Sequence, residues 1–190
     1  MACIFFISDP HFSHKNIVKF LRDDGTKLRP FETSEEMDET MIKNWNAIVR
    51  SQDKIYVNGD VCMKDSELEI LNRLNGHKRL VRGNHDISKT KVYMKYFEEI
   101  YGVRVFDDFI LSHYPLHPDS ITKRYSCNVH GHIHYNIVKD QNDVPDGRYF
   151  NICVEHINYT PISLEEMREQ IKAWQEKYPP IYRTYVKNLD

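Results

Sequence analysis

The residues best suited to chemistry in this sequence are carboxylates, one carboxamide and imidazoles that stand directly after short apolar runs. They are Asp9 and His11 after residues 4–8, Asp60 after 55–59, Asn84 and His85 after 80–83, His113 after 109–112, and His132 and His134 after 129–131. Asp, Asn and His donors without a thiolate suit Mn, Fe, Zn or Ni better than Ca or Mg alone. The pattern therefore predicts a metal site.

Each of these motifs also has an ordinary structural explanation when it stands alone. The D-x-H triplet at 9–11 suits a helix cap followed by a solvated histidine, and the G-D pair at 59–60 is a common turn. A lone His113 is more often a hydrogen-bonded structural histidine. The clusters at 83–86 and 131–134 are more specific, because alternate residues of an extended chain share one face. The joint presence of all five motifs is what favours a metal centre.

Strands and helices alternate along the chain in a way that can position these side chains. Apolar runs predict strands at 3–8, 54–57, 79–81, 103–111, 127–129 and 150–154. Helical spacing predicts helices at 35–49 and 66–74, and a capping box at Ser163 and Glu166 begins a C-terminal helix at about 163–177. We therefore expect one α/β domain over residues 1–190, with a second, more antiparallel sheet after residue 101.

Topology then explains why the polar motifs follow the strands. In open α/β sheets, ligands bind in the crevice outside the carboxyl ends of the strands. Five such ends carry candidate ligands here, and glycines at 59, 83 and 131 allow close approach of the backbone. The long connection at 22–36 is predicted to border the site.

Composition narrows the setting. The formal net charge of the 190 residues is −2, which predicts no general attraction to nucleic acid and leaves a local contact open. No apolar run reaches the roughly 18 residues of a membrane span, and no signal peptide is visible, so we expect a cytoplasmic protein without membrane association. The four cysteines, which form no C-x-x-C pair, are expected to be buried thiols, and composition indicates no oligomeric state.

The order D-x-H, G-D, G-N-H-D, H and G-H-x-H resembles the signature of the calcineurin-like metallophosphoesterase superfamily. The resemblance spans residues 9–134, about two thirds of the chain. The flanking residues 8–14 and 159–163 are similar to small stand-alone bacterial and phage members. This resemblance implies a four-layer α-β-β-α sandwich in which helices flank two mixed sheets.

The resemblance also assigns ligands to two divalent metal ions, of which Mn is the first expectation. One ion would be held by Asp9, His11, Asp60 and His134, and the other by Asp60, Asn84, His113 and His132. A shared anionic ligand such as Asp60 is what two neighbouring cations need. With Asp9 and Asp60 ionised the site would carry about +2, or about +1 with a bridging hydroxide, which suits a phosphoester substrate.

His85 is left outside the ligand set and is therefore predicted to be the general acid, with Asp86 or Asp60 orienting its imidazole. Arg29, Arg82 and His14 are candidates for substrate binding, and His130 for orienting a ligand. The substrate class is a phosphorylated small molecule or nucleotide. Phosphomonoester, phosphodiester and anhydride substrates remain open, and specificity is expected from residues 22–36 and 117–126.

Two other classes of protein match parts of this pattern. A phosphoesterase-fold scaffold that has lost catalysis would lack ligands or the acid, and none of those residues is replaced here. A metallo-β-lactamase-type hydrolase is suggested by histidines at 130, 132 and 134, but the Asp-His pair that its H-x-H-x-D-H motif requires is absent.

Overall fold

The computed structural model describes residues 2–182. The strands are β1 (Ile4–Ile7), β2 (Lys54–Val57), β3 (His77–Val81), β4 (Glu99–Tyr101), β5 (Val103–Phe106), β6 (Phe109–Ser112), β7 (Cys127–His130), β8 (Tyr149–Asn151) and β9 (Ile162–Ser163). The helices are α1 (Ser34–Ile48), α2 (Thr90–Tyr93) and α3 (Leu164–Lys177), with 3-10 helices η1 (Ile17–Lys19), η2 (Asp65–Arg73) and η3 (Pro118–Ser120).

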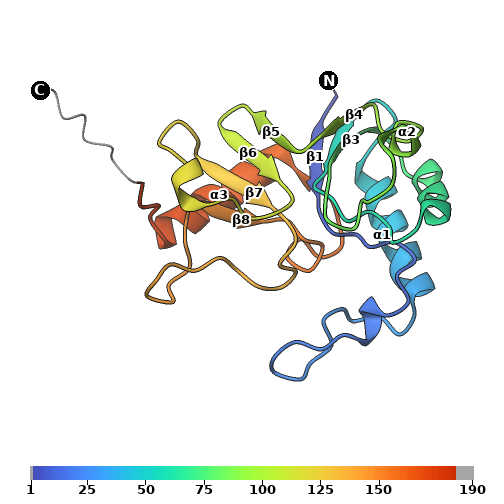
Figure 1. Cartoon of the computed structure of the whole chain (residues 1–190), viewed down its shortest axis with the longest axis horizontal. Coiled ribbons are helices and arrows are strands. Elements are labelled where there is room, and N and C mark those ends of the chain that lie inside the picture. The colour runs from blue at the N-terminus through green and yellow to red at the C-terminus, as the bar shows by residue number, and fades with distance from the viewer. Residues whose placement is uncertain (1, 183–190) are drawn as a thin grey trace, which may run out of the picture.

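Two mixed sheets lie side by side, as Figure 1 shows. The first has the order β4-β3-β2-β1-β9, with β1 to β4 parallel and β9 antiparallel to β1. The second has the order β5-β6-β7-β8, with only the β5–β6 pair antiparallel. The predicted α/β fold, with two mixed sheets and flanking helices, is confirmed.

Side chains alternate between two hydrophobic cores. Ile7, Ile55 and Leu80 point from the first sheet toward α1, η2 and α2. Phe6 and Val81 point the other way, into a core shared with Leu111 and Val129 of the second sheet. Helix α3 adds Met167 and Ile171 to this second core. Since both faces of the first sheet are buried, its strands read as unbroken apolar runs.

The helix boundaries follow local capping. Thr33 accepts a hydrogen bond from the N–H of Glu36 at the start of α1, and Ser163 accepts one from Glu166 at the start of α3. The predicted helices at 35–49 and about 163–177 are therefore confirmed. The helix predicted at 66–74 is η2, a 3-10 helix, and its leucines three residues apart match the three-residue turn of that helix.

Other predicted boundaries are corrected. The strand expected at 103–111 is two strands, because a turn at Asp107, with φ of 49°, reverses the chain between β5 and β6. The short strands β4 and β9 were not predicted. The expected single domain at 1–190 stays a prediction, and its residue 1 and residues 183–190 lie outside the described residues.

Every helix within residues 2–182 is too short or too polar to span a membrane.

Candidate metal centre

The predicted ligands stand in the turns that follow β1, β2, β3, β6 and β7, where the two sheets meet. Five of them have a left-handed backbone: Asp9 (φ 55°), His11 (49°), Asp60 (53°), His132 (71°) and His134 (48°). Only ten non-glycine residues among 2–182 have positive φ, so half of these unfavourable conformations lie at the site. Such strain persists where the surrounding structure enforces it and is concentrated at functional sites.

Asp60 lies at the centre of the imidazoles. Its Oδ2 is 3.6 Å from Nε2 of His11 and 3.4 Å from Nε2 of His113. Nε2 of His85 lies 4.0 Å from the same oxygen. One carboxylate therefore faces ligands that come from different strand ends.

Donor atoms gather in three groups whose members all lie within 4.8 Å of one another. The groups are Asp9, His11 and Asp60; Asp60, His113 and His132; and Asp9, His134 and Cys153. Asn84 joins the second group, because its Oδ1 is 2.8 Å from Nε2 of His113. The structure thus brings all seven predicted ligands together, and Asp60 belongs to two of the groups.

Unmatched polar atoms show that these residues fit a cation. Oδ1 of Asp9 and both ring nitrogens of His11 are buried and have no hydrogen-bond partner among residues 2–182. The other oxygen of Asp9 is saturated, since it accepts from Ser8 Oγ at 2.5 Å, His132 N at 2.9 Å and Cys153 Sγ at 3.2 Å. A buried acceptor without a donor is costly unless an ion completes it.

The ionisable groups of the site also favour a bound cation. Burial raises the pKa of Asp9 above its usual value. Burial opposes ionisation of Asp60 and protonation of His113 as well, but their mutual hydrogen bond and attraction outweigh it. The pKa of Asp60 is lowered, and that of His113 is raised to about 9. The two carboxylates therefore attract positive charge.

His85 stands at the open side of the centre. Its backbone N–H donates to Oδ1 of Asp60 at 2.8 Å, and its side chain is 42% exposed. Asp86 does not hold the His85 imidazole as expected; its carboxylate accepts from the N–H groups of Asp60, Val61 and Gly83. The catalytic role predicted for Asp86 is therefore corrected to shaping the turn that carries His85, and Asp60 is the carboxylate near the ring.

The two candidate arginines are occupied by protein groups. Arg29 is fully buried, with Nη2 on the carbonyl of Asp9 (2.7 Å), Nη1 on that of Pro10 (2.8 Å) and Nε on Glu155 Oε1 (2.8 Å). Arg82 donates to the carbonyls of Asp86 and Ser88. Arg29 is too deeply buried to reach a substrate phosphate, so the substrate-binding role predicted for it is wrong. Arg82 is only partly buried, and its substrate-binding role stays a prediction.

The candidate histidines lie on either side of the ligand turns. The His14 ring is 5.7 Å from the His11 ring and remains a candidate for contacting substrate. His130 is buried, and its Nδ1 contacts the carbonyl of Gly131 at 2.8 Å, which places it behind the turn that carries His132.

Glu155 is the main site residue that the motifs missed. Its Oε1 accepts from Arg29 and from His134 Nδ1, at 3.1 Å. Burial would raise the pKa of Glu155, but the Arg29 charge and the His134 hydrogen bond outweigh it and lower the pKa to about 2. A carboxylate behind a ligating histidine fixes its ring and tautomer. The available signal was a charged residue directly after the apolar run at 150–154.

Close backbone contacts explain the glycines that precede the ligands. A Cβ at Gly131 would lie 2.0 Å from Ser8 Oγ and 2.1 Å from Asp9 Oδ2. One at Gly83 would lie 2.2 Å from Asp60 Oδ1. Any side chain at these positions would displace a predicted ligand.

The fold and this ligand arrangement define a class. The chain belongs to the calcineurin-like phosphoesterase family, whose model matches residues 4–186. Membership and the grouped donors together support metal-dependent phosphoester hydrolysis in general terms.

Two of the similar proteins match most of the chain, and a third matches less than half of it. The uncharacterized protein MJ1445 of Methanocaldococcus jannaschii is 37% identical over 177 residues, which are 87% of this chain and 89% of that protein. The Gene 66 protein of Mycobacterium phage L5 is 31% identical over 93 residues, 45% of this chain and 41% of that protein. The crystal structure of AQ665 from Aquifex aeolicus, a protein of unknown function, superposes with a TM-score of 0.67 at 29% identity, covering 90% of this chain and 100% of that one.

Proposed function

We propose that this protein hydrolyses a phosphoester at two divalent metal ions, with Asp60 shared between them. The observation that carries the proposal is the position of Oδ2 of Asp60, 3.6 Å from the His11 donor and 3.4 Å from the His113 donor. Asp9, His11, Asp60 and His134 would hold one ion, and Asp60, Asn84, His113 and His132 the other. Mn²⁺ is the ion that we expect to activate hydrolysis by this protein.

Bound divalent ions would lower the pKa of a water nucleophile and neutralise phosphoryl oxygens. The protein itself holds the donor atoms so close together that only bound cations would offset their mutual repulsion. Arg29 fixes the Asp9–Pro10 turn through the two carbonyls, and Glu155 fixes His134. Preorganised groups of this kind need not rearrange when charge develops on the substrate.

His85 is proposed to protonate the leaving alkoxide. It is partly exposed, lies beside the ligand groups and has an anionic neighbour in Asp60. An imidazole can supply a proton near neutral pH to a leaving group that needs one. Asp60 reaches both the backbone and the ring side of His85, so one carboxylate would align the acid with the ligands.

The surroundings of the site support a nucleotide-like ester. Phe20 is 47% exposed and Tyr114 is 48% exposed. Their rings contact His14 and His132 with centroid separations of 5.9 and 4.4 Å. Exposed aromatic faces beside a phosphate site suit a substrate that carries a ring.

Metal-dependent hydrolysis tests this proposal directly. The Mn²⁺-loaded protein should cleave at least one of an aryl monoester, a bis-aryl diester, a cyclic nucleotide and single-stranded DNA, and a chelator should abolish the activity. Asp60→Asn should also abolish it. Asp107→Asn is the matched control, since Asp107 is an exposed aspartate with the same left-handed backbone. No cleavage of any substrate by protein with measured bound metal would favour the scaffold alternative.

A further inference from the structure

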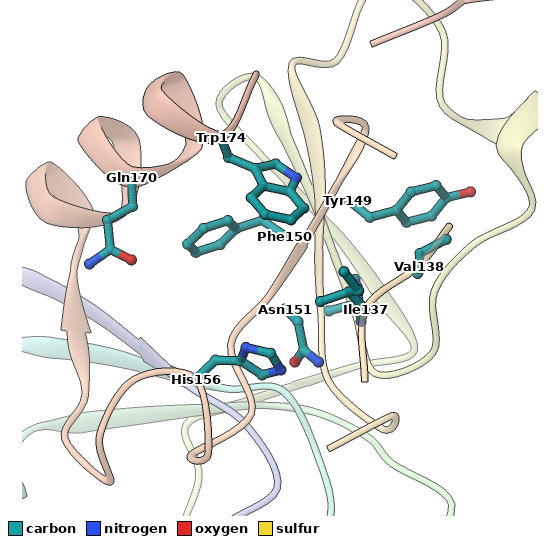
Figure 2. A pocket seen from close by; sticks show the side chains of 9 residues that line it. Ile137, Val138, Tyr149, Phe150, Asn151, His156, Gln170 and Trp174 are labelled. Atoms are coloured by element: carbon teal, nitrogen blue, oxygen red, sulfur yellow. The ribbon is translucent and has the colours of Figure 1, made fainter. Parts of the chain in front are cut away.

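A second hollow, separate from the ligand groups, is formed by β8, the segment at 137–138 and α3 (Figure 2). It contains about 500 Å³ of empty space, counting its open mouth. None of the seven predicted ligands and not His85 lines it. The feature is therefore not part of the site described above.

Its walls are aromatic and uncharged. Tyr149 and Phe150 come from β8, and Trp174 comes from α3, with the Trp174 and Phe150 rings next to each other in Figure 2. No Asp, Glu, Lys or Arg side chain is among the lining residues. Such walls favour a flat, uncharged ring, because aromatic faces bind through area and quadrupole contacts and no cation is present to hold a phosphate.

Two polar atoms on these walls lack protein partners. The indole N–H of Trp174 is buried and has no acceptor among residues 2–182. His130 is 1% exposed, and its Nδ1 faces the carbonyl of Gly131, which can only accept; the hydrogen therefore sits on Nδ1. This leaves Nε2 of His130 as an acceptor, with no hydrogen bond to any described residue. The buried indole N–H is costly to leave without an acceptor unless a ligand supplies one, and Nε2 of His130 offers a place for a second hydrogen bond.

We propose that this pocket binds an uncharged planar heteroaromatic molecule of nucleobase size. The ring would lie against Phe150, and its edge would offer an acceptor to the indole N–H of Trp174 and a donor to His130. A purely aliphatic molecule would leave both polar atoms unmet. A phosphorylated molecule would bring a charge that no lining side chain neutralises.

The pocket also contacts the support of a predicted metal ligand. His156 Nε2 lies 2.9 Å from the carbonyl of His134, and Asn151 Nδ2 donates to the same carbonyl at 2.7 Å. Both residues line the pocket. An occupant would therefore touch the side chains that hold the His134 peptide in place.

The two tryptophans make the test selective, because the sequence contains only Trp45 and Trp174. We would titrate ¹⁵N-labelled full-length protein with adenine and follow the two indole N–H signals by NMR, assigned with Trp174→Phe. The Trp174 signal should move in a saturable way. The Trp45 signal should not move, since Trp45 is fully buried and already donates to Asn75 O at 2.9 Å.

Single substitutions test whether adenine binds in this pocket. Phe150→Leu should weaken adenine binding at least about fivefold, since it removes a stacking face. Phe106→Leu, a matched substitution of a partly buried phenylalanine that does not line the pocket, should leave it unchanged. If Phe150→Leu fails to fold, Gln170→Ala at the exposed mouth replaces it and should weaken binding measurably.

Three results would overturn the proposal. The first is no saturable change of the Trp174 signal up to about 1 mM adenine, where a binding free energy of about 4 kcal/mol gives half occupancy. The second is equal affinity of the wild type and the folded pocket variant. The third is adenosine monophosphate moving the Trp174 signal at much lower concentration than adenine, which would contradict an uncharged ligand class.

Discussion

At the scale of single residues, Asp60 differs from the other predicted ligands because its two donor groups contain ligands proposed for both ions, His11 in one group and His113 with His132 in the other. Asp9 also belongs to two groups, but the predicted ligands in both are those proposed for a single ion. Loss of a shared ligand and loss of a peripheral ligand should therefore have different effects on metal content.

We expect Asp60→Asn to bind neither ion stably, because both would lose the same anionic donor. His11→Ala should retain one ion, held by the group that contains His113 and His132. Metal content per protein, measured by mass spectrometry after Mn²⁺ loading and gel filtration, gives the two stoichiometries. Asp107→Asn should retain the wild-type content, and equal losses in the Asp60 and His11 variants would remove the bridging role.

The role of His85 is tested by the leaving group. His85→Asn should slow hydrolysis of an alkyl ester by about 10²-fold or more and slow a nitrophenyl ester much less, because a good leaving group needs no proton. The kinetic parameter to compare is kcat/KM for the two esters. His77→Asn, which changes a half-exposed histidine at the start of β3, serves as the control. Equal losses on both esters would exclude proton donation.

At the scale of elements, the structure links a loop near the start of the chain to a turn near its end. Arg29 lies in the segment at 22–36 and Glu155 follows β8, yet the two form a fully buried ion pair at 2.8 Å. The same arginine holds the Asp9–Pro10 turn. The Arg29 guanidinium thus links two turns. One carries Glu155, the partner of His134, and the other carries Asp9 and His11.

Breaking this buried pair should be costly. Glu155→Gln would leave the Arg29 charge buried without its anion, and we expect a loss of about 3–5 kcal/mol in the free energy of unfolding. The exposed pair Arg73 and Glu39 is a matched comparison, with a contact of 2.7 Å; Glu39→Gln should cost about 1 kcal/mol or less. Urea unfolding of metal-free protein measures both. Similar losses in the two variants would show that burial does not distinguish the pairs.

Helix α1 supports the first ligand turn through Asp38, whose carboxylate accepts from the N–H of Ser13 at 2.9 Å. Burial raises the pKa of Asp38 from 3.8 to about 6. The folded state therefore holds the proton more tightly, and the free energy of unfolding falls as the pH rises from about 3.8 to about 6. Asp38→Asn should flatten this part of the pH profile, by on the order of 3 kcal/mol at most.

Unfolding in urea at pH 4.5 and 6.5 compares the slopes. Glu169→Gln, at an exposed position on α3, should keep the wild-type pH dependence. An unchanged profile in Asp38→Asn would assign the effect to other carboxyl groups.

How far the sequence could predict these features depends on how local each signal is. Apolar runs and capping residues predicted α1, α3 and most strands, and the strand-end pattern marked the seven predicted ligands that the structure brings together. Asp86 and Arg29 were assigned wrong partners because a charged residue beside a motif does not reveal what it will face. Their partners are backbone groups contributed by other turns, and Glu155 is 126 residues from Arg29.

At the scale of the whole molecule, the two sheets each carry a different set of predicted ligands. The turns after strands of the first sheet carry Asp9, His11, Asp60 and Asn84, and the turns after strands of the second sheet carry His113, His132 and His134. The ligand groups that Asp60 shares draw on both. The proposed centre therefore requires the two sheets to be docked, and bound metal should raise the stability of that docking.

The Arg29–Glu155 pair has a consequence for the order of events during synthesis. All predicted metal ligands have left the ribosome once residue 134 has emerged, but the anion that anchors His134 and neutralises Arg29 comes 21 residues later. The β9 strand, which closes the first sheet against β1, follows later still. Because long-range contacts form only after both partners are available, the growing chain holds a full set of donors before it has a site, and mature metal binding should await residues 155–163.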